Sequence, residues 1–208
     1  MFEKNQTVIF EGDSLTKRGA PPHHNTWPYL RLMKWERTWA DAFEELLFAW
    51  HPELNLKTVN NAAGGSNIKG MMERLDRLPV SAKPDWIIAT IGNNDPHQGI
   101  SVIEFETLVR GYVEKARCKL LFLGGFKPPG NPSVPYCEIL ARVAGETGNH
   151  YLDAGGALRE KQAVFHALNE IHTVYSDGAH LNELGSLVVA GEVLKFFFPN
   201  PPRAPVSS

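Results

Sequence analysis

Short apolar runs alternate with longer stretches of helical spacing along the whole chain. The runs predict strands at about residues 7–10, 54–59, 86–91, 120–123 and 150–152. Runs of this length, bounded by Gly, Pro, Asn or Asp, are typical of buried strands. The stretches between them repeat apolar residues three and four positions apart, which predicts helices. Strands that alternate with helices favour an α/β fold, with a parallel sheet covered on both faces.

Several of the predicted helices have recognisable starts. Thr38 and Ser101 each have an acidic residue three positions later, which is the capping-box pattern, and Ser133 is a third expected cap. Other helices are predicted from about 68 to 78, near 158–168 and at about 183–198. The apolar face is expected at Trp39, Phe43, Leu46, Leu47 and Trp50 in the first helix, and at Leu184, Leu187, Val188, Leu194 and Phe197 in the last. We interpret both tryptophans as core residues.

Length and charge narrow the possible classes of protein. The 208 residues suit a single domain, expected over 1–199, followed by a disordered Pro/Ser tail at 200–208. The 21 basic and 23 acidic side chains are nearly balanced, which argues against a nucleic-acid partner. The sequence shows neither a signal peptide nor an apolar stretch of membrane-spanning length, so we expect a cytoplasmic protein without membrane insertion. Cys118 and Cys137 lack metal-site spacing and are interpreted as buried thiols.

The candidate chemistry begins where the first strand ends, at Gly12-Asp13-Ser14. In open parallel sheets the carboxyl ends of the strands form the edge where ligands bind. Ser14 is therefore a candidate nucleophile. The same three residues are also ordinary turn formers, so the segment alone does not decide between the two interpretations.

Three later segments, 60–67, 92–95 and 177–182, fall after a strand or immediately before a helix. Together with Ser14 they supply what acyl transfer requires. His180 is the candidate general base, and Asp177 is the carboxylate that would orient its imidazole. The amides of Ser14 and Gly65 and the side chain of Asn94 are candidate donors to an oxyanion.

These four segments resemble the blocks of the SGNH or GDSL hydrolases, a family of esterases and lipases. Gly12 to Leu15 is similar to the first block, Gly65 to the oxyanion glycine, 92–95 to the Gly-x-Asn-Asp block and 177–180 to the Asp-x-x-His block. Asn93 departs from the small or hydroxyl residue expected between Gly92 and Asn94. The resemblance implies a flavodoxin-like three-layer α/β/α sandwich with a five-stranded parallel sheet. It also implies ester hydrolysis by a Ser-His-Asp triad, without a metal or cofactor.

The predicted substrate is a small-molecule ester with a short acyl group, such as acetyl, on a polar or carbohydrate alcohol. The long segment after Ser14 contains three prolines and has no regular period, so it is expected to be a loop at the active edge. Candidate substrate contacts are His23, Trp27, Asn93 and His97. The loops at this edge are mainly polar and offer no continuous apolar groove for a long acyl chain.

Two other kinds of function remain open at this level. A catalytically silent relative would bind a carbohydrate or acyl ligand at the same edge, although it would not need the triad residues. A thioesterase or a lysophospholipase would use the same residues on another ester. A flavodoxin-like nucleotide binder is disfavoured, because no glycine-rich phosphate-binding fingerprint follows the first strand.

Overall fold

A parallel sheet forms the middle layer of the computed structural model, which describes residues 1–17, 37–79, 83–126, 132–168, 173–176 and 180–199. Its described strands pair in the order β2-β1-β3-β4-β5, and every pair is parallel. They are β1 (Thr7–Glu11), β2 (Lys57–Asn60), β3 (Trp86–Thr90), β4 (Lys119–Gly124) and β5 (His150–Asp153). From β1 the chain adds strands on both sides, which is the doubly wound order of flavodoxin-like folds.

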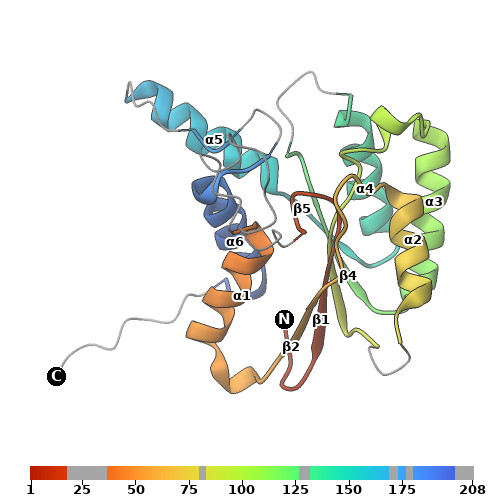
Figure 1. Ribbon diagram of the computed structural model, residues 1–208, viewed down its shortest axis with the longest axis horizontal. Helices are drawn as coiled ribbons and strands as arrows, with labels where there is room; N and C mark the ends of the chain where they lie inside the picture. Colours follow the sequence, from red (N-terminus) through yellow and green to blue (C-terminus); the bar gives the residue numbers. More distant parts are fainter. Residues whose placement is uncertain (18–36, 80–82, 127–131, 169–172, 177–179, 200–208) are drawn as a thin grey trace, which may run out of the picture.

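Helices cover both faces of this sheet, as Figure 1 shows. One outer layer consists of α1 (Trp39–Trp50), α5 (Ala154–Ala167) and α6 (Glu183–Phe197). The other consists of α2 (Ile68–Arg77), α3 (Val102–Ala116) and α4 (Val134–Glu146). The three-layer α/β/α sandwich with a parallel sheet of five strands, expected from the sequence, is confirmed.

Successive residues of β1 pack against opposite layers. Val8 and Phe10 belong to the core on the α1 and α6 side, whereas Ile9 belongs to the core on the α2 to α4 side. The Phe10 ring meets Trp39 and Phe43 of α1 edge-on, with ring centroids 5.7 and 5.9 Å apart. A central parallel strand is buried on both faces, which explains its continuous apolar sequence. The strand that leads into Ser14 is therefore held from both sides.

Two elements begin at other residues than predicted, because of local side-chain and backbone geometry. The second strand begins at Lys57 rather than at 54, because Pro52–Leu54 form a 3-10 turn and Asn55 adopts a left-handed φ of 46°. Helix α5 begins directly after β5 rather than near 158. The Asp153 side chain caps it by accepting a 2.9 Å hydrogen bond from the Gly156 amide.

The predicted helix caps differ in how they form. Thr38 makes the full capping box with Asp41, and Ser101 accepts a 3.2 Å hydrogen bond from the Glu104 amide. Ser133 is the N-cap residue of α4, but its side chain makes no capping hydrogen bond. Its own backbone already has helical angles, and Pro135 in the first turn has no N–H to donate.

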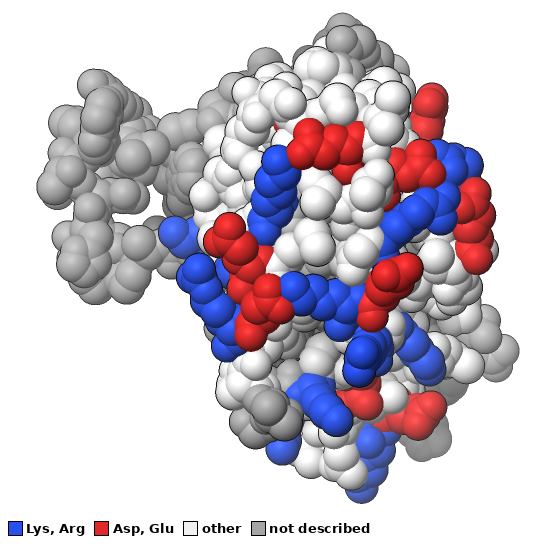
Figure 2. Space-filling view, turned by 90° about the vertical axis from the view of Figure 1, so that its right-hand side faces the viewer, with Lys and Arg blue, Asp and Glu red and all other residues white. Residues whose placement is uncertain are grey.

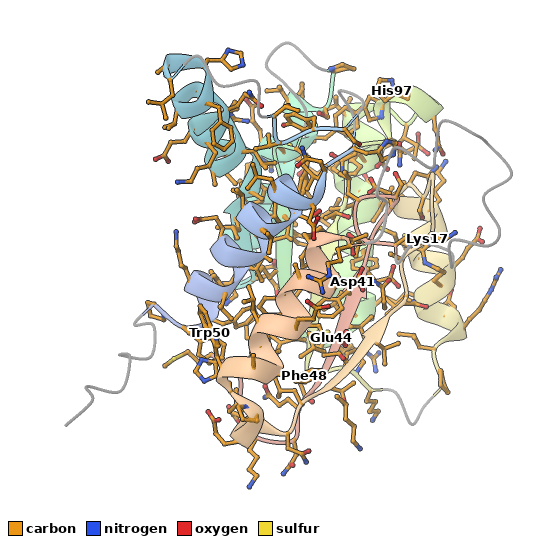
Figure 3. The ribbon with its side chains drawn as sticks, turned by 60° about the vertical axis from the view of Figure 1, so that its left-hand side comes forward. Lys17, Asp41, Glu44, Phe48, Trp50 and His97 are labelled. Atoms are coloured by element: carbon orange, nitrogen blue, oxygen red, sulfur yellow. The ribbon has the colours of Figure 1, made fainter. Side chains whose placement is uncertain are left out.

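The two tryptophans of α1 have different environments. Trp39 is fully buried, as predicted, whereas Trp50 is 46% exposed, so its assignment to the core was wrong. The helical spacing places both on one face. However, Trp50 is the last residue of α1, at the end of the helix away from the carboxyl edge of the sheet, and Figure 3 shows it there.

The buried face of α6 is rotated from the predicted stripe. Leu194 and Phe197 are buried as expected, but Leu187 is 44% exposed and Val189 and Val193 are fully buried instead. Most positions in this helix are apolar, so periodicity alone selects the face poorly. Close packing at Gly185 selects it, because a Cβ atom at that position would lie 2.2 Å from the Val174 carbonyl oxygen.

The outer face of the α2 to α4 layer carries acidic and basic side chains side by side, as Figure 2 shows. Across α3 and α4, Arg142 pairs with Glu106 at 2.7 Å and Arg110 pairs with Glu146 at 2.5 Å. The two guanidinium groups lower the pKa of Glu106 to about 2. Exposed pairs of this kind contribute little to stability. They help to fix the relative positions of the two helices.

Both cysteines are free and partly buried rather than fully buried. Burial raises the pKa of the Cys118 thiol to about 12 and also raises the pKa of Cys137. Across the described ranges, the helices are too short or too polar to cross a bilayer. The expected tail at 200–208 lies outside the described residues, and the single domain over 1–199 stays a prediction.

A pair of glycine substitutions in α6 tests the close packing at Gly185. We expect Gly185→Ala to lower the free energy of unfolding, because its methyl group would clash with the Val174 carbonyl. Gly191→Ala, in the same helix, places its methyl group in open space and should stabilise the protein by up to about 1 kcal/mol through helix propensity. Urea unfolding of both variants makes the comparison. Equal effects would contradict the proposed packing constraint.

Candidate active site

Ser14 lies in a tight turn at the carboxyl end of β1. Gly12, which begins the turn, has a φ of +144°, and a Cβ atom there would lie 2.0 Å from Thr90 Oγ1. Glycine therefore lets the end of β1 approach the end of β3. Asp13 then closes the turn: its Oδ1 accepts a 2.9 Å hydrogen bond from the Leu15 amide, and its carbonyl accepts one of 2.9 Å from the Lys17 amide.

Thr16 anchors the far side of this turn. Its buried hydroxyl lies 2.6 Å from the Thr90 hydroxyl and accepts a 3.1 Å hydrogen bond from the indole N–H of Trp39. The Asn60 side chain donates to the Thr16 carbonyl at 2.8 Å. Residues from β2, β3 and α1 therefore fix the backbone that carries Ser14.

The hydroxyl of Ser14 meets the imidazole of His180. Ser14 Oγ and His180 Nε2 are 2.9 Å apart, although 166 positions separate the two residues in the sequence. His180 lies just before α6, where the Ser176 amide donates to its carbonyl at 2.9 Å. Asn182 then caps the helix by accepting a 2.9 Å hydrogen bond from the Gly185 amide. The predicted partner Asp177 lies outside the described residues.

The loop after β2 brings Gly65 to the same edge. Gly65 is exposed and has a left-handed φ of +72°, which glycine adopts without strain. Its carbonyl accepts a 2.7 Å hydrogen bond from the Gln98 side chain. The Ala63 amide donates to the Gly12 carbonyl at 3.0 Å, which connects this loop to the Ser14 turn.

The side chains of Asn93 and Asn94 both donate to the buried carboxylate of Asp13. The distances to Asp13 Oδ2 are 3.1 Å from Asn93 and 3.3 Å from Asn94. Asn94 also donates to the Ser66 carbonyl at 3.0 Å. Asn93 is only 3% exposed, which leaves little of its surface for a substrate. Asn94 is less buried and contacts both the Ser14 turn, through Asp13, and the Gly65 loop, through Ser66.

Asp95 connects β3 to α2. Its two carboxylate oxygens accept hydrogen bonds from the amides of Ile68, at 2.9 Å, and Gly92, at 3.1 Å. Burial raises the pKa of Asp95 above its usual value, although both amides oppose the shift. These contacts give Asp95 a structural role at the start of α2.

A small hollow of about 30 Å³ lies against Ser14 and His180. Its other lining residues are Leu15, Lys17, Arg37, Thr38, Leu181 and Ser186. Sequence reasoning did not assign Lys17, Arg37 or Thr38 to the site. Lys17 follows Ser14 closely in the sequence, which is a local signal, and Figure 3 shows it on the side of the molecule away from α5. Arg37 is paired with Glu45 of α1 at 3.2 Å.

Three substrate contacts were predicted besides Asn93, and the structure describes one of them. His97 is exposed on the 3-10 turn Pro96–Gln98, which follows Asp95 (Figure 3). His23 and Trp27 lie outside the described residues. Within the described ranges, no group of three or more His, Cys, Asp or Glu side chains is arranged to hold a metal ion.

Comparison with known proteins identifies the family. The model of the GDSL-like lipase/acylhydrolase family matches residues 10–187, a span that includes the Ser14 turn, the Gly65 loop and His180. The chain belongs to this family. Its description agrees with the carboxylic ester hydrolase expected from the sequence.

Individual relatives are more distant. An acetylxylan esterase from Geobacillus stearothermophilus is 24% identical over 135 residues, which cover 55% of this chain and 62% of that protein. The structure of a catalytic mutant of Axe2, an acetylxylan esterase from the same organism, has a TM-score of 0.75 at 19% identity. The match covers 93% of this chain and 94% of the Axe2 chain. LAE5, an alpha/beta hydrolase enzyme from the metagenome of Lake Arreo, has a TM-score of 0.72 at 20% identity, covering 93% and 95%. At these identities the structural similarity establishes the fold.

Proposed function

We propose that this member of the GDSL-like family is a serine esterase that uses Ser14 as nucleophile and His180 as general base. The observation that carries the proposal is the 2.9 Å contact between Ser14 Oγ and His180 Nε2. This distance allows the imidazole to accept the hydroxyl proton as the oxygen attacks an acyl carbon. The fixed turn beneath Ser14 supports the same role, because a nucleophile must be held in its reactive position.

The reaction has two acyl-transfer steps. Ser14 Oγ forms a bond to the acyl carbon while His180 takes its proton, and the carbonyl oxygen becomes an oxyanion. Collapse of this intermediate breaks the bond to the alcohol, which leaves with the proton from His180. Water, activated by the same imidazole, then hydrolyses the acyl-enzyme and restores Ser14.

Asp177 is proposed to orient the His180 imidazole and to stabilise its protonated form. The sequence supplies this carboxylate directly after Ser176, whose amide contacts the His180 carbonyl at 2.9 Å. The contact brings the backbone on the two sides of 177–179 together. Asp177 lies three positions before His180 in the sequence, which supports its choice as the carboxylate partner.

The oxyanion is proposed to receive hydrogen bonds from the amides of Ser14 and Gly65 and from the Asn94 side chain. The Asn94 amide group has two protons, which point to the Ser66 carbonyl at 3.0 Å and to Asp13 at 3.3 Å. When the oxyanion forms, we expect Asn94 to exchange its longer hydrogen bond, to Asp13, for a hydrogen bond to the oxyanion. Asn93, at 3.1 Å, would continue to satisfy the carboxylate.

The proposed substrate is an ester with a short acyl group, such as acetyl, on a polar or carbohydrate alcohol. The hollow of about 30 Å³ beside Ser14 is small, and Lys17 and Thr38 contribute polar groups to its lining. A long acyl chain would gain only about 0.8 kcal/mol per methylene, and only where apolar surface receives it. The acetylxylan esterase among the relatives is consistent with this choice.

Replacement of the nucleophile tests the proposal directly. We expect Ser14→Ala to fold normally and to lose hydrolysis of p-nitrophenyl acetate by several orders of magnitude, because no acyl-enzyme can form. Labelling by a fluorophosphonate should be lost as well. Thr107→Ala is the control, since the Thr107 hydroxyl is exposed on α3 and donates to the Ile103 carbonyl of the same helix. Full activity in Ser14→Ala would refute the triad and favour a binding protein.

The two asparagines provide a test of the oxyanion donor. Asn94→Ala should reduce kcat about a hundred- to a thousandfold with little change in KM, because the lost bond forms only in the transition state. Asn93→Ala is the control, because it removes a hydrogen bond to the same Asp13 oxygen without removing the proposed donor. Equal losses in both variants would instead indicate that the asparagines act through Asp13.

A panel of acyl groups tests the substrate proposal. We expect kcat/KM to be highest for p-nitrophenyl acetate and to fall through butyrate, octanoate and palmitate, because among the described lining residues Leu15 and Leu181 alone offer apolar side chains to a longer chain. Acetylated xylo-oligosaccharides, an acetyl thioester and a lysophospholipid should be assayed beside them. A maximum at octanoate or longer, or on the lysophospholipid, would overturn the short-acyl proposal and leave the triad intact.

A further inference from the structure

Arg74 of α2 connects two parts of the proposed active site that are far apart in the sequence. Its Nη2 atom donates to Glu11 Oε2 at 2.8 Å and to the Gly12 carbonyl at 3.1 Å. Its Nη1 atom donates to Ser66 Oγ at 2.7 Å. One guanidinium group therefore contacts the backbone just before Ser14 and the residue just after Gly65.

A buried carboxylate holds this guanidinium in place. The Glu11 side chain is fully buried, and that of Arg74 is 18% exposed. Glu11 also accepts hydrogen bonds from the Asn61 side chain and the Gly12 amide. Burial raises the pKa of Glu11, whereas Arg74 and these two donors lower it. A buried carboxylate without a partner is costly, so the pair constrains the position of Arg74.

The three contacts of Arg74 require its planar, forked shape. A guanidinium group presents several N–H donors in fixed directions, whereas a lysine ammonium is a single centre on a flexible stem. A lysine at position 74 can neutralise Glu11, but it cannot reach the Gly12 carbonyl and the Ser66 hydroxyl with the same geometry. Charge neutralisation and connection of the two segments are therefore separable by substitution.

We infer that Arg74 is a positioning residue that sets the Gly65 loop at the correct distance from the Ser14 turn. The inference rests on the proposed function, because the relevant geometry is the convergence of the Ser14 and Gly65 amides on one oxyanion. Arg74 does not touch the reacting atoms and acts through Gly12 and Ser66. Displacement of such donors by about 1 Å reduces turnover strongly while substrate binding changes little.

Arg74→Lys is the main test variant. We expect its kcat for p-nitrophenyl acetate to fall about ten- to a hundredfold with KM nearly unchanged, and its Tm to stay close to that of the wild type. Amide hydrogen exchange in the segment 61–67 should become faster. Arg77→Lys is the matched control, because Arg77 lies on the same helix, is exposed, and pairs with Glu73 at 3.6 Å. The control should change none of these values.

Ser66→Ala provides a second variant that keeps the Glu11–Arg74 pair. It removes the Ser66 hydroxyl, which accepts from Arg74 and also donates to the Asn67 carbonyl at 3.3 Å. It should lower kcat and accelerate exchange in 61–67 in the same direction, by a smaller amount. If Arg74→Lys does not fold, this variant decides the question. Wild-type kcat and unchanged exchange in either folded variant would overturn the inference.

The two proposals can fail separately. If the wild type shows no hydrolysis that depends on Ser14, the proposed function is wrong, and exchange in 61–67 still decides whether Arg74 positions this loop. If the wild type is active through Ser14 and Arg74→Lys matches it in kcat and in exchange, only the role of Arg74 is wrong.

Discussion

The carboxyl edge of the sheet around Ser14 depends most on the hydrogen bonds that the carboxylate of Asp13 accepts. One of its oxygens closes the turn of Ser14 through the Leu15 amide, and the other receives the side chains of Asn93 and Asn94 from the end of β3. It is only 2% exposed, so these donors must satisfy a buried negative charge. The Ser14 turn and Asn94, the proposed oxyanion donor, are thus held near each other by the cost of leaving this carboxylate without partners.

The loops next to the Ser14 turn are also held by hydrogen bonds from polar side chains rather than by apolar packing. Arg74 joins the end of β1 to Ser66, Gln98 holds the Gly65 carbonyl, and Asp95 holds the start of α2. Each of these side chains meets backbone or hydroxyl groups at the carboxyl ends of β1, β2 or β3. Polar contacts of this kind have defined directions, so they determine geometry at the edge of a sheet whose interior is determined by close packing.

The two outer layers contribute differently to the site. Helix α1 supplies Trp39, which fills the core beneath the sheet and donates to Thr16, whereas α6 starts at the turn that carries His180. Close packing at Gly185 places the first turn of α6 directly against the Val174 carbonyl. The 2.9 Å contact between Ser14 and His180 therefore depends on how α6 docks, because nothing local to either residue requires them to meet.

The sequence by itself determined the fold class and the order of elements, because hydrophobic period, caps and turn residues are local properties. It also indicated Ser14, Gly65, Asn94 and His180. Only the tertiary structure decided which face of α6 is buried, that Trp50 is exposed, that Asn93 is used internally and that Arg74 spans two loops. These features depend on contacts between residues distant in the sequence, where packing and buried charge select one arrangement among several that the local pattern allows.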